Sequence, residues 1–194
     1  NGAKGTRHAL HYAFGLHLNP ELPDTDSATL LRYFKAYLCL HDWLEQREDI
    51  VAARKLSPYI RGFANDYCRR VIDLDYWPDL PQFSEDYLAA NPSRNRSLDL
   101  LPILAWYDEA RVQQAVQDDK VNKRPTLHYR LPNSDIDNPH WSLTHAWSGW
   151  LQVEALANDE RRLKQVCGHY AAHLDSLTPD FLDPWKSKVT PWLR

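Results

Sequence analysis

Two short segments about 110 residues apart alternate apolar and polar side chains. In the first segment, residues 14–22, Phe14, Leu16 and Leu18 alternate with Gly15, His17 and Asn19. In the second segment, residues 124–137, Leu127, Tyr129 and Leu131 alternate with Thr126, His128 and Arg130. Because side chains of a strand have a period of two, each segment is predicted to be a strand with one buried face. The imidazole, amide and guanidinium groups on the other face indicate a site for an anion or a metal-bound phosphate.

Most of the remaining chain repeats its apolar residues with a helical period. This pattern predicts helices at 26–48, 58–75, 98–116, 140–157 and 159–176, and a shorter one through Tyr87 and Leu88. The proline-rich tail at 178–194 is predicted to pack over the surface through four apolar anchors: Phe181, Leu182, Trp185 and Trp192.

These elements predict an α+β fold that is mainly helical. The chain has 194 residues, of which 43% are hydrophobic, so it can bury a real core. No repeat or interior linker interrupts it, and residues 1–194 are interpreted as a single domain. The chain contains no methionine and leads within a dozen residues into a strand, which indicates a piece of a longer polypeptide or a record with residues missing.

The composition narrows the classes of partner. The net charge is −3 and the sequence pI about 6.3, so no strong positive field favours nucleic acid or an anionic membrane. No apolar run approaches the roughly 20 residues of a membrane span, and the opening NGAKGTRHAL lacks the apolar region of a signal peptide. The three cysteines are interpreted as small core residues of a cytoplasmic protein.

The histidines include one pair with the spacing of a zinc-binding helix. His169 and His173 are four residues apart, but no HExxH motif accompanies them, so surface histidines explain the pair better. His17 differs, because a glycine and an asparagine lie close to it in an otherwise regular strand. Its residue type is compatible with a metal ligand and with a hydrogen-bonded structural histidine.

Four arginines are candidates for binding an anion. Arg94 and Arg96 lie in the loop NPSRNR, and Arg124 and Arg130 bracket the second strand. The planar guanidinium binds carboxylate or phosphate with two parallel hydrogen bonds and stays charged. The alternative is a set of surface ion pairs with Glu85, Asp86 and Asp99, which would contribute little to stability.

Other kinds of chemistry find no support in the sequence. There is no GxSxG motif, no cysteine with a histidine in a suitable turn, and no glycine-rich phosphate loop among the six glycines. Eight tryptophans without a basic stripe are typical of helix packing and not of a surface that stacks nucleic-acid bases.

Four segments together carry a resemblance to a known family: GAKGT, FGLHLNPEL, NPSRNRSLDLLP and KVNKRPTLHYRLPNSDIDNPHWSL. In this order, from about residue 2 to 175, the chain resembles the putative amidoligase family. That family belongs to the carboxylate–amine ligases related to glutamine synthetase and glutamate–cysteine ligase. The resemblance implies a helical portion packed on an antiparallel sheet of that type, in the C-terminal part of a larger amidoligase domain.

The resemblance also implies a reaction that depends on ATP and Mg²⁺. A carboxylate of a small molecule or peptide takes the γ-phosphoryl group of ATP, and an amine then attacks the acyl phosphate to give an amide. No nucleic acid or membrane partner is implied, and neither the carboxylate, the amine nor the oligomeric state can be named.

The resemblance assigns roles to individual residues. His17 matches the metal-ligating histidine of the family, and Arg130 matches the catalytic arginine that stabilises the phosphoryl group. His128 stands where the wider superfamily has a metal-binding glutamate, and is a second candidate metal ligand. The candidates for nucleotide or substrate contact are Arg94, Arg96, Asn19 and Arg124.

One motif of the wider superfamily is missing. Its enzymes hold magnesium with the glutamates of an acidic GxExEx strand near the N-terminus, and no such strand occurs here. Because Mg²⁺ prefers oxygen ligands, His17 and His128 alone are a poor magnesium site. Either the strand lies upstream of Asn1 or the chain is not active alone. Two other hypotheses remain: an inactive binding or scaffold module that uses the tryptophan-rich helices, and a metal-dependent hydrolase that uses His17 and His128 to bind zinc.

Overall fold

The computed structural model describes residues 4–7, 15–55 and 58–194 of the chain. The described part is mostly helical with one small antiparallel sheet, which confirms the α+β class. Its elements are α1 (Ser27–Arg47), α2 (Ala52–Lys55), η2 (Pro58–Ile60), α3 (Asn65–Ile72), α4 (Leu80–Ala90), β1 (Leu98–Asp99), α5 (Leu101–Tyr107), α6 (Glu109–Val116), β2 (His128–Tyr129), α7 (Leu143–Ala157), α8 (Glu160–Leu174), α9 (Trp185–Val189) and η3 (Thr190–Trp192).

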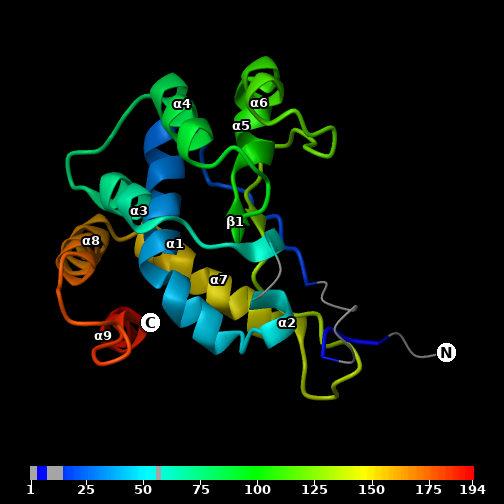
Figure 1. Cartoon of the computed structure of the whole chain (residues 1–194), viewed down its shortest axis with the longest axis vertical. Helices are drawn as coiled ribbons and strands as arrows, with labels where there is room; N and C mark the ends of the chain where they lie inside the picture. Colours follow the sequence, from blue (N-terminus) through cyan, green and yellow to red (C-terminus); the bar gives the residue numbers. More distant parts are fainter. Residues whose placement is uncertain (1–3, 8–14, 56–57) are drawn as a thin grey trace.

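Helix α1 is the central element of the fold (Figure 1). Asp26 begins it, because its carboxylate accepts a hydrogen bond from the Thr29 amide at 2.8 Å and so satisfies a free donor of the first turn. The helix packs against α3, α7, α8 and α9, and every residue from Tyr33 to Leu40 is buried. A helix buried on all sides belongs to a core, so α1 is the axis on which the other helices assemble.

The small sheet brings the two predicted strands together. In the antiparallel pair of β1 and β2, Asp99 lies opposite His128. Residues 15–21 line the other edge of β2 through isolated bridges, one of which joins Leu18 to Tyr129. Regular pairing covers only part of the predicted segments 14–22 and 124–137, and Phe14 lies outside the described residues. Prolines at 20, 125 and 132 explain the short ladder, because proline has no N–H to donate.

One face of β2 packs on the helices, as the alternation predicted. Leu127, Tyr129 and Leu131 are buried. The Tyr129 ring lies 5.3 Å from the Trp150 ring of α7 and 5.9 Å from the Tyr37 ring of α1. These aromatic contacts fix the strand against the two helices. The side chains between them in the sequence therefore point away from this core.

The helix predictions at 26–48, 140–157 and 159–176 are confirmed as α1, α7 and α8, and the short helix through Tyr87 as α4. The single helix predicted over 98–116 is wrong. The Leu98–Asp99 backbone pairs with β2, and the Asp108 side chain accepts from the Arg111 amide at 3.1 Å to begin a new helix. The helix predicted over 58–75 is only partly present, as η2 and α3.

The predictions for the tail are partly wrong. Trp185 is buried and donates its indole N–H to the Cys39 carbonyl at 2.7 Å. Phe181 and Leu182, by contrast, are 81% and 67% exposed and do not anchor the tail. Asp180 holds this turn away from the core, because its carboxylate accepts from the Trp185 amide. The Asp180 carboxylate also lies 3.1 Å from Nε2 of His173. The His173 side chain is only 10% exposed, so the surface position predicted for it is also wrong.

Two sequence expectations about the core and the membrane can be compared with the described residues. All three cysteines are free and buried, which confirms their prediction as core residues. Among residues 4–7, 15–55 and 58–194, no helix combines the length and the hydropathy that a membrane span needs.

Candidate active site

Three side chains form a hydrogen-bonded chain across the polar face of the sheet. His128 lies between the other two: its Nδ1 is 3.3 Å from Asp99 Oδ2, and its Nε2 is 3.2 Å from His17 Nδ1. Asp99 is buried and His17 is exposed, so the chain runs from the interior to the surface. The sheet register positions it, because Asp99 is directly opposite His128 and Leu18 is directly opposite Tyr129.

The buried carboxylate sets the direction of these hydrogen bonds. An ionised carboxylate can only accept, so His128 donates its Nδ1–H to Asp99 and keeps a lone pair on Nε2. His17 must then donate from Nδ1 to that lone pair. The remaining ring nitrogen, His17 Nε2, carries a lone pair at the exposed end of the chain. We call these three residues the Asp–His–His relay.

His17 stays neutral at ordinary pH. Burial of part of the ring against the protein, and then the neighbouring His128 and Arg130, lower the pKa of His17 to about 4. A neutral ring is also what the relay requires, since protonated His17 would have no lone pair to offer at Nε2.

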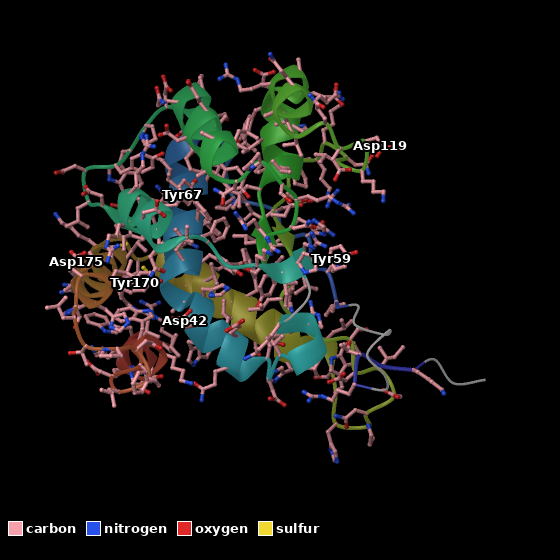
Figure 2. The ribbon with its side chains drawn as sticks, viewed as in Figure 1. Asp42, Tyr59, Tyr67, Asp119, Tyr170 and Asp175 are labelled. Atoms are coloured by element: carbon pink, nitrogen blue, oxygen red, sulfur yellow. The ribbon has the colours of Figure 1, made fainter. Side chains whose placement is uncertain are left out.

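Arg130 is a buried cation of this face with one donor left unpaired. It is 6% exposed, its Nη1 donates to the Arg94 carbonyl at 2.6 Å, and its buried Nε has no hydrogen-bond partner in the described part of the chain. Burial and then Arg94 lower the pKa of Arg130, while Asp99 and Tyr59 raise it. Figure 2 shows Tyr59 on the sheet side of the molecule, away from Tyr170.

A second buried arginine, Arg54, binds the main chain of the segment that carries Arg130. Arg54 is 2% exposed, and its guanidinium donates to the carbonyls of Arg130, Leu131 and Pro132 at 2.6, 2.5 and 2.7 Å. Burial, and then Arg130, lower the pKa of Arg54 to about 10. Gly15 makes room for this group: a Cβ on Gly15 would lie 2.2 Å from Arg54 Nη2. The strand that carries Arg130 is thus held through its main chain.

The predicted contact residues Asn19 and Arg124 meet at the edge of this face. Arg124 Nε donates to Asn19 Oδ1 at 3.0 Å, and the Arg124 amide donates to the Pro102 carbonyl at 3.1 Å. Among the described residues no carboxylate forms an ion pair with Arg124, so its charge is also free to meet an anion.

The two loop arginines separate in the structure. Arg94 contacts Arg130 through its carbonyl, and its Nε lies 3.2 Å from Asp118 Oδ2. Arg96 donates to Asn91 at 2.8 Å, and its guanidinium lies 5.7 Å from the Phe63 ring centre. In the described part of the chain, no hydrogen bond joins the Arg96 side chain to the relay or to Arg130. The structure therefore brings Arg94 to the site and leaves Arg96 beside it.

The ion pairs weighed as an alternative for these arginines do not form in the described residues. Asp86 pairs instead with Arg70 at 2.7 Å, and Asp99 with His128. The only ion pair of a predicted site arginine there is the one between Arg94 and Asp118.

The relay does not suit magnesium. Mg²⁺ requires oxygen ligands, whereas the exposed end of the relay offers an imidazole nitrogen, and the Asp99 carboxylate is occupied by His128 and by the Leu101 amide. Within the described ranges no group of three histidine, cysteine or acidic side chains is arranged to hold a metal ion.

Sequence reasoning missed Asp99 and Arg54 as site residues. Asp99 appeared only as a surface partner of the arginines, because residues 98–116 resembled a helix. The dipeptide Leu98-Asp99, apolar then acidic, was a weak strand signal. Arg54 had no signal at all, since the groups that it binds are main-chain carbonyls contributed by every residue type.

The comparisons with known proteins agree with the resemblance in the sequence. A family model described as "putative amidoligase enzyme" matches residues 1–152, which include all of the relay and the five arginines described above. No curated protein and no solved structure matches the chain significantly. Since the family model covers well over half of the 194 residues, the chain belongs to the family of putative amidoligase enzymes.

Proposed function

We propose that this chain carries part of the active site of an ATP-dependent carboxylate–amine ligase, built on a sheet of the glutamine-synthetase type. The proposal rests on one observation: Arg130 is a buried cation whose Nε has no partner, and it lies close to two further arginines, Arg54 and Arg94. Asp99 compensates the buried charge of Arg130 only in part, so an anionic ligand suits this face. Family membership indicates which reaction the anion takes part in.

In the first step, an oxygen of the substrate carboxylate attacks the γ-phosphorus of ATP, the bond to ADP breaks, and an acyl phosphate forms. Phosphoryl transfer depends mainly on positioning and on stabilising the charge of the three phosphoryl oxygens. Arg130 has a donor for this role in its unpartnered Nε. Arg54 keeps the strand that carries Arg130 in place, and Arg94 and Arg124 supply further positive charge.

In the second step, the amine nitrogen attacks the acyl carbon, phosphate leaves, and the nitrogen loses a proton. The relay directs the lone pair of His17 Nε2 outward. With a pKa of about 4, His17 is too weak a base to hold that proton near pH 7. We therefore assign it the role of accepting a hydrogen bond that orients the amine, with Asp99 fixing the orientation through His128.

Magnesium remains an implication of the family and not of these residues. When bound, the ion would neutralise charge on the ATP phosphates. The ligand set on this face does not suit it, so no step above depends on it. Oxygen ligands for Mg²⁺ have to come from outside the relay.

Hydroxylamine gives a direct test, because it is an amine that converts any acyl phosphate into a hydroxamate. The full-length protein, including any residues that precede Asn1, would be incubated with ATP, Mg²⁺, hydroxylamine and a panel of amino acids, dicarboxylates and short peptides, and hydroxamate and ADP would be measured together. We expect equal amounts of both products with at least one carboxylate. The Arg130→Ala variant should lower the rate by about a hundredfold or more.

The matched control is Arg111→Ala on α6, a half-exposed arginine outside the site whose ion pair in the described part of the chain is with Asp108. Its rate should equal that of the unchanged protein. Hydroxamate formation that Arg130→Ala leaves unaltered would refute the role of Arg130. If the folded full-length protein gives no hydroxamate with any carboxylate of the panel, the inactive binding module is the better proposal.

One distance favours a second candidate, the zinc-dependent hydrolase. His17 Nδ1 and His128 Nε2 are 3.2 Å apart, close to the ~3.3 Å expected between two nitrogens on one tetrahedral zinc with Zn–N bonds of about 2.0–2.1 Å. Asp99 would then orient His128, as carboxylates do for metal-bound histidines. A catalytic zinc needs a third protein ligand, which the described residues do not supply, so we place this candidate second. Metal analysis of the purified protein distinguishes the two candidates, since the hydrolase requires about one tightly bound zinc per chain.

A further inference from the structure

A buried lysine lies in the core helix α1, outside the relay and without an ion pair to a carboxylate in the described part of the chain. Lys35 is 1% exposed. Its ammonium donates to the Asp73 carbonyl at 2.7 Å and lies 4.1 Å from the centre of the Trp77 ring. Among the described residues, no carboxylate forms an ion pair with it. An ammonium has three N–H donors, so this arrangement leaves donors unsatisfied in a desolvated position.

Lys35 lines a cavity of about 320 Å³ between α1, α8 and the loop after α3. Two other cations, Arg32 and Lys164, line the same cavity, and Glu160 is its single lining carboxylate. Glu160 is a weak partner: its side chain is 83% exposed and its oxygen is 3.9 Å from Arg32. In a protein whose net charge is −3, this cavity is a local excess of positive charge.

The rest of the lining is mostly apolar. It comprises Ala28, Leu74, Trp77, Leu163 and the buried thiol of Cys167. Leu74 and Trp77 are 43% and 47% exposed, so a large apolar surface stands open at the mouth of the cavity. Burial lowers the pKa of Lys35, and the nearby Cys167, Asp73 and Asp75 offset this lowering only in part.

We propose that this cavity binds an organic anion, with its acid group on Lys35, Arg32 and Lys164 and its apolar body against Trp77 and Leu74. The acid group satisfies the free donors of Lys35 and gives it a counterion. The apolar body covers the exposed indole and leucine side chains. Cavities of this size with a few convergent polar groups are the usual form of small-molecule sites.

The proposal is independent of the ligase activity. The residues that form one wall, Glu160, Leu163, Lys164 and Cys167 of α8, lie beyond the part of the chain that the family model matches. The relay and Arg130 contribute nothing to the lining. Loss of ligase activity therefore leaves this site unaffected, and the reverse also holds.

Three probes of the same shape test the proposal: 3-phenylpropionate, 3-phenylpropanol and 3-phenylpropylammonium, titrated into the full chain by calorimetry. We expect the acid to bind about tenfold or more tightly than the alcohol, since hydrogen bonds to charged groups are the stronger ones, and the ammonium not to bind. Inorganic phosphate should bind at least about tenfold more weakly than the acid, because it lacks the apolar body.

Substitutions at the surface of the cavity locate the site without disturbing the core. Lys164→Gln and Arg32→Gln should each weaken binding of the acid by about three- to tenfold. Lys120→Gln is the charge-matched control, because Lys120 is an exposed lysine that does not line the cavity, and it should leave the affinity unchanged. Lys35→Met should abolish binding; if that variant does not fold, the two glutamine variants still decide.

Three results would overturn the proposal. Equal affinity for the acid and the alcohol would mean that the cations take no part. Equal affinity for the acid and inorganic phosphate would mean that the apolar body of the ligand contributes nothing to binding. An equal effect of Lys120→Gln and Lys164→Gln would show that net charge matters and not this cavity.

Discussion

Replacing Arg54 with methionine should destabilise the protein more than any substitution of an exposed arginine. Methionine replaces the aliphatic part of the arginine side chain, but it is shorter and cannot donate a hydrogen bond. The carbonyls of Arg130, Leu131 and Pro132 would then lose their shared donor in a region where Arg54 itself is 2% exposed. Buried carbonyl groups without partners keep the cost of their desolvation.

The magnitude follows from two opposing contributions. Hydrogen bonds to a charged donor contribute about 1.5–3 kcal/mol each, so three of them contribute about 5–9 kcal/mol. Against this, burial and Arg130 lower the pKa of Arg54 from 12.5 to about 10, which corresponds to a cost of about 3 kcal/mol for keeping the charge. The balance predicts a loss of about 2–6 kcal/mol from a total stability of about 5–15 kcal/mol.

Urea unfolding measures this loss. With a slope of about 2–3 kcal/mol per molar urea, the midpoint of Arg54→Met should fall by about 1–3 M. Arg54→Lys should fall in between, since a single ammonium cannot reach three carbonyls in the geometry of a guanidinium. The control is Lys55→Met, an exposed neighbour on the same helix, which should change stability by no more than about 0.5 kcal/mol. Equal midpoints for Arg54→Met and this control would refute the reasoning.

Three further predictions concern the sheet. His17→Asn should make the stability of the protein less dependent on pH. The pKa of His17 is about 4 in the folded chain and about 6.5 in the unfolded chain, so between these values only the unfolded chain takes up the proton. Unfolding of the unchanged protein should therefore become easier as the pH falls from about 6.5 to 4, more than in the variant, and identical slopes would contradict the neutral ring. Asp99→Asn should lower hydroxamate formation by about 10–100-fold at an almost unchanged melting temperature, because the amide no longer fixes the tautomer of His128; a normal rate would exclude the relay. Gly15→Ala should lower the stability of the fold by about 1–3 kcal/mol, because the new Cβ would clash with Arg54. The control is Gly168→Ala in α8, where a Cβ meets nothing within 4 Å, and it should raise the melting temperature slightly. A more stable Gly15→Ala than Gly168→Ala would disprove the close approach of Gly15 to Arg54.

Much of the polar face could be predicted because strand periodicity depends only on sequence. The alternation around His17 and around His128 and Arg130 assigned these side chains to faces, and the pairing of Leu18 with Tyr129 joins the two faces into one. The chain separation of 111 residues between His17 and His128 gave no hint of their contact at 3.2 Å. That contact required the register, which sequence periodicity leaves open.

The errors have physical causes that a single sequence does not reveal. Residues 98–116 have a helical apolar pattern, but the backbone of Leu98 and Asp99 finds partners in β2 and becomes a strand. Phe181 was expected to anchor the tail because of its residue type, yet the Asp180 hydrogen bond to the Trp185 amide fixes a turn that leaves it in solvent. In the first case long-range backbone pairing overrode a local helical pattern, and in the second a local turn overrode the preference of the residue type.

The central position of α1 has a consequence for how the family region can be handled as a protein. The family model ends at residue 152, inside α7, whereas α1 buries its surface against α7, α8 and α9 together. A fragment cut at that boundary would lose Val153 and Leu156 from α7, as well as Trp185, which donates to the carbonyl of Cys39. The region that the family model matches is therefore shorter than the set of helices that pack on α1, and expression of this region should extend at least through α9.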